Sequence, residues 1–300
     1  MTFAFARLRH ALTIASMLAS ATLLPNIGHA HTASPFLMPE QFDTKHDNIT
    51  LQSGITVEKY YVPSRNYSST FQYTRPDGTT ESISKTADFQ RFSVLEIDTP
   101  TDGTYHVQSA KTPSSQIKFV QVDGRWLRIR DQRPVATTSP NTATAATPST
   151  TPRRFIFADE IKPDMPTHHV NVIQLAETYI SKGAPTPLAK PTGKGFEIVP
   201  ITHPNEVYAS EAFEFLAQYD GKPLADLELE AYQGSGTYDQ TSTKDLGHFK
   251  TDAQGKVSIP LNNIAGVYLI STQYPPVSRD NTQRPHDQIY LYGLTFQATP

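Results

Sequence analysis

The 300-residue sequence contains no cysteine, which excludes a disulfide framework and any metal site built on thiolates. Charged residues make up only 18% of the chain and the net charge is −3. The basic surplus of nucleic-acid-binding proteins is therefore absent, and we expect no nucleic-acid partner. No stretch reaches the roughly 18 consecutive apolar residues that a membrane-spanning helix requires. Proline is abundant instead, with 24 residues, which favours short strands joined by turns.

The first 30 residues have the three parts of a secretory signal peptide. Arg7 and Arg9 form a basic start, and residues 11–24 form an apolar run that is too short for a comfortable membrane span. The small residues Gly28 and Ala30 suit a cleavage site. We predict cleavage after Ala30, which changes the net charge from −3 to −5 and gives an exported protein. An uncleaved N-terminal anchor is the alternative.

Residues 31–133 are predicted to form an N-terminal β-sandwich domain. Short runs rich in β-branched and aromatic residues alternate there with turn signals. One of these runs, if extended, places Tyr105 and Val107 on one face and His106 and Gln108 on the other. A turn followed by such a strand is typical of Ig-like sandwiches.

The middle of the chain has a different composition. Residues 134–152 contain no charge, four prolines and seven threonines, so they cannot bury a core. We predict a flexible Pro/Thr/Ala linker, and a long surface loop explains the composition equally well. Residues 153–189 are predicted to be a connecting strand region. Its apolar part, 169–180, suits a helix or a strand, and its β-branched residues favour the strand.

Residues 190–300 are predicted to form a second sandwich. Residues 227–232 alternate strictly between apolar and polar, and Asp220-Gly221 has the composition of a hairpin turn. About seven short strands are expected in this segment, the number found in Ig-like sandwiches. The predicted fold class is therefore all-β, with two Ig-like or prealbumin-like β-sandwich domains joined by the Pro/Thr-rich linker.

Three C-terminal segments resemble a known family. They are residues 190–205 (KPTGKGFEIVPITHPN), residues 220–224 (DGKPL) and residues 251–257 (TDAQGKV). Near the N-terminus, His31 directly follows the predicted cleavage site, and the apolar segment 36–39 ends in proline. Together these features resemble domain of unknown function 4198, a family of exported bacterial proteins often described as NikM-like periplasmic components of nickel or cobalt uptake.

The resemblance implies several properties. The second sandwich would be Ig-like or carboxypeptidase-regulatory-like, and the protein would be periplasmic. Its biology would be uptake of a transition metal or an iron–siderophore complex. The implied partner is a membrane-embedded or outer-membrane uptake component.

Two histidines are predicted as metal ligands. After cleavage, His31 would offer both an α-amino group and an imidazole, which can chelate one ion. A further imidazole would complete three nitrogen ligands, a set that suits Cu(II) or Ni(II). His203, in a turn after a strand, is the second predicted ligand. The alternatives are a frayed terminus at His31 and a turn residue that caps backbone groups at His203. The neighbours His168 and His169 would point to opposite faces of a strand.

No hydrolase, phosphate-binding or dinucleotide-binding motif is present in the sequence, so we predict no catalytic residue, no organic cofactor site and no enzymatic activity. The predicted function is that of a periplasmic accessory or binding protein which handles a divalent transition metal (Ni, Co or Cu) or a metal complex for an uptake system. The alternative is a structural or protein-interaction module of the cell envelope with no metal site. A copper enzyme with an N-terminal histidine site is the third class.

Overall fold

The computed structural model describes residues 33–57, 62–67, 69–131, 153–234, 244–276, 278 and 280–300. The predicted signal peptide, the predicted ligand His31 and the predicted linker 134–152 lie outside this part. Residues His31–Pro300 form one compact unit. Within the described ranges the structure is nearly all β, with a single 3₁₀ turn at Ala158–Glu160, which confirms the predicted all-β sandwich class.

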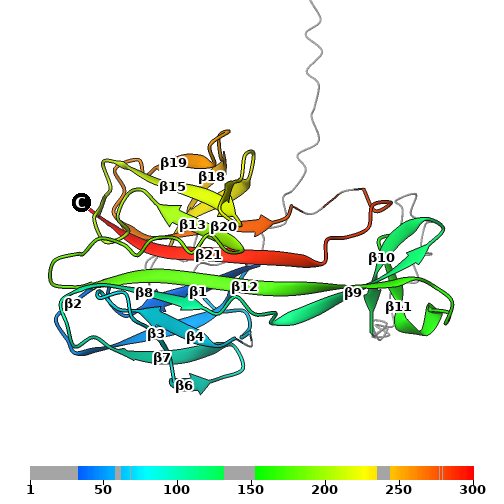
Figure 1. The fold of residues 1–300 in the computed structure, drawn as a ribbon, viewed down its shortest axis with the longest axis horizontal. Coiled ribbons are helices and arrows are strands. Elements are labelled where there is room, and N and C mark those ends of the chain that lie inside the picture. Colours follow the sequence, from blue (N-terminus) through cyan, green and yellow to red (C-terminus); the bar gives the residue numbers. More distant parts are fainter. Residues whose placement is uncertain are drawn as a thin grey trace, which may run out of the picture. The chain divides into compact units, whose positions relative to one another are not determined.

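The N-terminal sandwich consists of two facing sheets that bury one core (Figure 1). The first sheet has the strand order β1-β3-β7-β6, and the second contains β5, β4, β8 and β12. The bounds are β1 Ser34–Pro39, β3 Asn48–Thr56, β4 Phe71–Thr74, β5 Thr80–Ser82, β6 Lys85–Asp88, β7 Phe92–Asp98, β8 Gly103–Ser109 and β12 Thr167–Lys182.

Strand β8 shows how the sequence pattern produces this core. Tyr105 and Val107 are fully buried between the sheets, while His106 and Gln108 are only partly buried on the opposite face. The predicted division of these four residues between two faces is therefore confirmed. It arises because successive side chains of a strand point to opposite sides.

Strand β12 is the longest in the protein's described part, with 16 residues, and it is a strand as predicted for residues 169–180. On one edge, the beginning of β12 pairs with β9 (Ser115–Val122) and its end pairs with β8, while the short β2 (Asp43–Thr44) pairs with the end of β12 on the opposite edge. Along its other edge β12 runs parallel to β21 (Gln288–Thr299). Figure 1 shows β12 and β21 side by side, with the N-terminal strands on one side and the C-terminal strands on the other.

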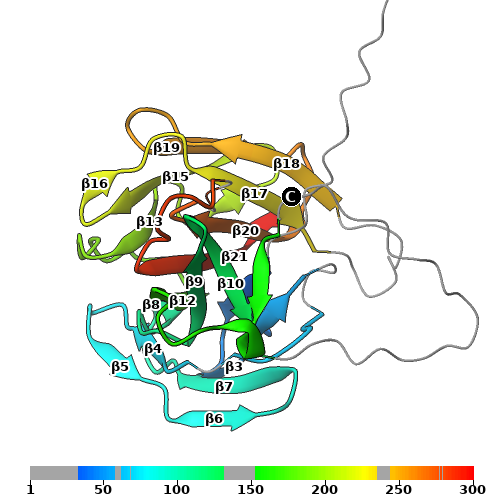
Figure 2. The same cartoon turned by 90° about the vertical axis from the view of Figure 1, so that its right-hand side faces the viewer.

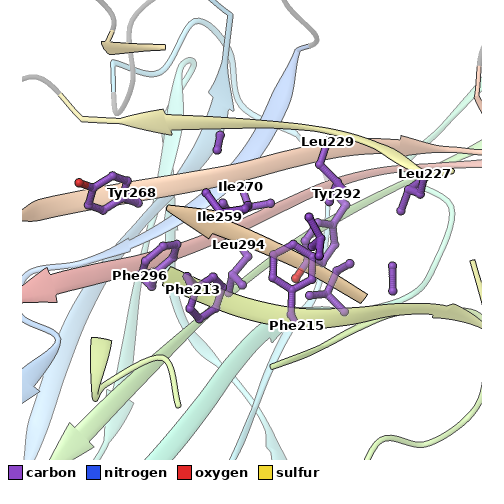
Figure 3. Packing of buried hydrophobic residues seen from close by; sticks show 14 of the residues in the cluster. Phe213, Phe215, Leu227, Leu229, Ile259, Tyr268, Ile270, Tyr292, Leu294 and Phe296 are labelled. Carbon is purple, nitrogen blue, oxygen red and sulfur yellow. The ribbon is translucent and has the colours of Figure 1, made fainter. Parts of the chain in front are cut away.

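The C-terminal sandwich is built on β21. Its sheet continues through β20 and β17 to β18, with β14 paired to β21, and the facing sheet contains β13, β15, β16 and β19 (Figure 2). The bounds are β13 Phe196–Pro200, β14 Val207–Tyr208, β15 Ala212–Tyr219, β16 Lys222–Pro223, β17 Glu228–Gln233, β18 Lys244–Lys250, β19 Lys256–Pro260 and β20 Gly266–Tyr274. Figure 3 shows the apolar core, where the ring of Phe213 stacks on that of Phe296 with centroids 4.2 Å apart.

The beginning of β12 also belongs to a smaller sheet extension. Strand β10 (Arg125–Arg130) pairs with β9, and β11 (Phe155–Phe157) pairs with β10. A cluster of Val120, Leu127 and Ile156 fills one face of the extension. The ring of Trp126 meets His168 edge-on, with centroids 5.9 Å apart.

Candidate functional site

A cleft of about 910 Å³ lies between the outward face of the N-terminal sandwich and the segment that leads into the C-terminal one. Strands β4, β5 and β8 contribute one wall, and residues 188–200 contribute the other. Strand β12 and Tyr292 of β21 supply further lining. The second wall includes most of the family-like segment that begins at Lys190.

A histidine–glutamate pair lies in the cleft. His106 Nε2 is 2.7 Å from Glu177 Oε2, and the two side chains are 20% and 10% exposed. The imidazole also stacks on the ring of Tyr179, with centroids 4.3 Å apart and an angle of 4° between the planes. Because both the hydrogen bond and the stack constrain the ring, His106 is held in one orientation.

The other oxygen of Glu177 accepts a hydrogen bond from the Tyr292 hydroxyl. Burial raises the pKa of Tyr292 well above its ordinary value, and the adjacent Glu177 carboxylate raises it further. Burial and Glu177 act in the same direction on the pKa of Tyr179. Both phenols therefore stay neutral, and both oxygens of Glu177 have partners. His106 Nδ1 has no hydrogen-bond partner among the described residues, which leaves it available to a ligand.

Glu197 organises the opposite wall. Its Oε1 accepts from the Thr192 backbone and hydroxyl groups and from Lys111 Nζ at 3.2 Å. Its Oε2 accepts from the Gly193 backbone N–H and from the Gln218 amide, both at 2.9 Å. Burial raises the pKa of Glu197, but these hydrogen bonds and the Lys111 ammonium group outweigh burial and hold it below its ordinary value. One carboxylate thus fixes the loop that lines the cleft.

His203, predicted as a metal ligand, lies outside the cleft lining and has protein partners at both ring nitrogens. Its Nε2 donates to the Thr186 carbonyl at 3.0 Å and lies 3.3 Å from the Thr104 hydroxyl. Its Nδ1 accepts from the Asn205 backbone N–H at 3.1 Å. A metal ion would have to displace one of these contacts, so the assignment of His203 as a ligand stays a prediction.

The turn that contains His203 connects the two sandwiches. Asn205 donates from its side chain to the carbonyls of Phe42 and Tyr179 and accepts from the Ser181 hydroxyl. This geometry matches the alternative considered for His203, a turn residue that caps backbone groups. His31 lies outside the described residues, so the structure does not place the two predicted ligands relative to each other.

Sequence reasoning assigned no role to the His106–Glu177 pair. His106 is isolated in the sequence, and Glu177 lies 71 positions away in an otherwise apolar run. The alternation of β8 correctly places His106 on the outward face, but no spacing rule connects it to Glu177. Across the described ranges, no group of three or more His, Cys, Asp or Glu residues could hold a metal ion.

The described chain is thus an all-β protein of the sandwich class with a cleft between its halves that is lined by both polar and apolar side chains. A family model described as "Domain of unknown function (DUF4198)" matches residues 28–275, and the chain belongs to this family. A search of curated proteins found no match. In the parts that the structure describes, no helix is both long and apolar enough to span a bilayer.

Similar solved structures include the "D0-D1 domain of Intimin", which is 13% identical, with 88% of this chain and 97% of that chain covered and a TM-score of 0.22. Another, titled "Marsupial T cell receptor", is 8% identical, with 88% and 74% covered and a TM-score of 0.20. These scores are too low to support a conclusion about function.

Proposed function

We propose that this protein is a non-enzymatic, exported accessory protein of the periplasm that binds a small metal complex in the cleft and passes it to a membrane uptake component. The observation that carries the proposal is the cleft itself. Its volume of about 910 Å³ is far larger than a bare ion needs and lies within the usual range of small-molecule sites, roughly 300–1,000 Å³.

Several polar groups of the cleft are held in fixed positions where a ligand could contact them. The His106–Glu177–Tyr292 cluster is fixed by hydrogen bonds and stacking, and Glu197 fixes the facing loop. A site whose walls are ordered before the ligand arrives loses less conformational entropy on binding. His106 Nδ1 offers an open polar contact, either to the metal or to the molecule that carries it.

The test is calorimetric titration of the mature protein with nickel(II) and cobalt(II) as citrate complexes and as bare ions. We expect one complex per chain, and at least tenfold weaker binding in Gln108→Trp, because the indole would occupy the cleft beside His106. Tenfold corresponds to about 1.4 kcal/mol. Gln297→Trp, on an exposed site of β21, is the control. Ala189→Trp on the facing wall is a second blocking variant if Gln108→Trp does not fold.

Two results would contradict the proposal. No binding of any complex would leave a protein-interaction module as the function. Bare-ion binding that exceeds binding of the complex, and that disappears in the double variant His31→Ala/His203→Ala, would assign metal handling to the two histidines predicted from the sequence instead.

A further inference from the structure

Of the lysines that line the cleft, one has protein partners for its ammonium group and two form no ion pair. Lys111 Nζ donates to the Lys194 carbonyl at 2.9 Å and contacts Glu197. Lys190 and Lys194 also line the cleft, and their side chains are exposed. Neither of these two ammonium groups forms an ion pair with any residue in the described ranges. Two positive charges at the rim are therefore unneutralised.

Both carboxylates of the cleft accept hydrogen bonds from protein groups. Glu177 and Glu197 are the acidic residues of the lining. Both oxygens of Glu177 accept hydrogen bonds from His106 and Tyr292, and both oxygens of Glu197 accept from its loop and from neighbouring side chains. The lining carries three lysines (Lys111, Lys190 and Lys194) against these two glutamates, so its formal charge is 3 − 2 = +1 with His106 left out.

We infer that the cleft selects anionic, carboxylate-bearing metal complexes, with Lys190 and Lys194 as the contacts that determine the sign of the ligand's charge. This inference rests on the proposed function, because it requires the cleft to be the ligand site. Lysine ammonium groups act as compact charges on flexible stems, so they bind carboxylates of varied geometry. His106 Nδ1 is a further polar contact deeper in the site.

The experiment uses two cobalt(III) complexes of opposite charge. The EDTA complex is an anion covered with carboxylates, and the tris(ethylenediamine) complex is a cation. Both exchange ligands too slowly for a protein side chain to replace one, so calorimetry reports recognition of the intact complex. Free citrate, a polycarboxylate without metal, is the third probe. Titrations are carried out at low and at physiological salt, because salt screens charges near the surface.

We expect the full mature protein to bind the anionic complex, to bind it less tightly as salt increases, and not to bind the cation. In the double variant Lys190→Glu/Lys194→Glu, binding of the anion falls at least tenfold and the cation begins to bind. Lys162→Glu, an exposed lysine outside the cleft, leaves both affinities unchanged. Citrate binds more weakly than the anionic complex. Equally tight citrate binding would overturn the assignment to a metal complex.

The inference and the proposed function fail in different ways. If the cation binds as tightly as the anion and Gln108→Trp blocks both, the charge preference is overturned while the cleft remains the ligand site. If neither binds, the proposed function itself is contradicted. If the charge-reversal variant does not fold, Lys190→Gln/Lys194→Gln takes its place. We expect it to bind the anionic complex less tightly than the wild type does. If that variant binds the anionic complex as tightly as the wild type does, the inference is overturned.

Discussion

Glu197 illustrates how one side chain fixes a loop. Its two oxygens accept five hydrogen bonds, counting the Lys111 contact, and two of these come from the backbone of Thr192 and Gly193. The loop has little apolar side-chain surface of its own, with Leu188 as its contact to the C-terminal core. The charged form of Glu197 therefore holds residues 192 and 193 of the cleft wall, beside the strand β13 that forms the rest of it.

This role predicts a pH dependence. The pKa of Glu197 in the folded protein lies below its ordinary value of 4.5, so ionisation stabilises the fold above that value. As the pH falls from about 4.5 through the lower folded pKa, this stability is lost. We expect Glu197→Gln to lower the free energy of unfolding at pH 7 by on the order of 2 kcal/mol and to flatten its acid dependence.

Urea unfolding of both proteins between pH 3 and pH 7 measures the effect. Glu206→Gln is the control, because Glu206 is exposed and has no ion pair within the described ranges. Parallel curves for wild type and Glu197→Gln would show that the loop does not depend on this carboxylate.

Some residues of the site could be placed from the sequence alone, and others could not. The alternation of β8 is sufficient to place His106 and Gln108 away from the core. It does not reveal Glu177, because that partner reaches His106 only through the pairing of Tyr179 with His106 across β12 and β8. His203 could be recognised as a turn residue, but its contacts with Thr186 and Thr104 depend on chain segments 17 and 99 positions away.

At the element scale, β1 and β21 pack with almost no space between their backbones. A Cβ atom added at Gly293 would lie 1.9 Å from the carbonyl oxygen of Pro35, a distance that atoms cannot adopt. The absence of a side chain at this point of β21 is therefore what allows β1 to lie against it. The requirement is steric and does not involve an unusual backbone conformation.

We predict that Gly293→Ala destabilises the protein by about 3 kcal/mol or more, because β1 must shift and break its packing. Chemical unfolding monitored by circular dichroism gives the value. Gln297→Ala, on the same strand but exposed, should change the free energy of unfolding by less than about 0.5 kcal/mol. Equal stability of Gly293→Ala and wild type would show that the close approach of β1 is not maintained in solution.

Element type was the most predictable feature at this scale. The β-branched residues of 169–180 favoured a strand, and β12 is one. The pairing of β12 was not predictable, since its two edges contact strands that come from both ends of the chain. Register between distant strands depends on which apolar faces meet in three dimensions, and a single sequence does not contain that information.

At the scale of the whole molecule, β12 contributes to both sandwich cores, with Ile180 in the first and Ile173 in the second. Strand β1 places Leu37 in the N-terminal core, and its Phe36 packs in a small separate cluster with Tyr232 of β17 and Leu269 of β20. Because β12 serves both cores and β1 contacts strands of the C-terminal sandwich, the two sandwiches cannot separate without exposing apolar surface from each.

We therefore predict one cooperative unfolding transition. Fluorescence of Trp126, the single tryptophan, reports on the β9–β11 extension, while circular dichroism reports on the whole chain. The two urea curves should coincide in wild type and move together in Phe36→Ala, with a loss of about 3–5 kcal/mol. Phe89→Ala, at an exposed phenylalanine, is the matched control. Separate midpoints for the two probes would show that the parts unfold independently.

The sequence by itself determined the all-β class, the alternating faces of its strands and the family, because these depend on local periodicity and on contiguous motifs. Only the tertiary structure decided that Glu177 meets His106 and that the family-like loop faces them across a cleft. It also decided that β12 serves both sandwich cores and that Phe36 of β1 packs on Tyr232 and Leu269. The physical reason is that such contacts join residues separated by up to hundreds of positions, and they form only when apolar faces pack and strands choose their partners together.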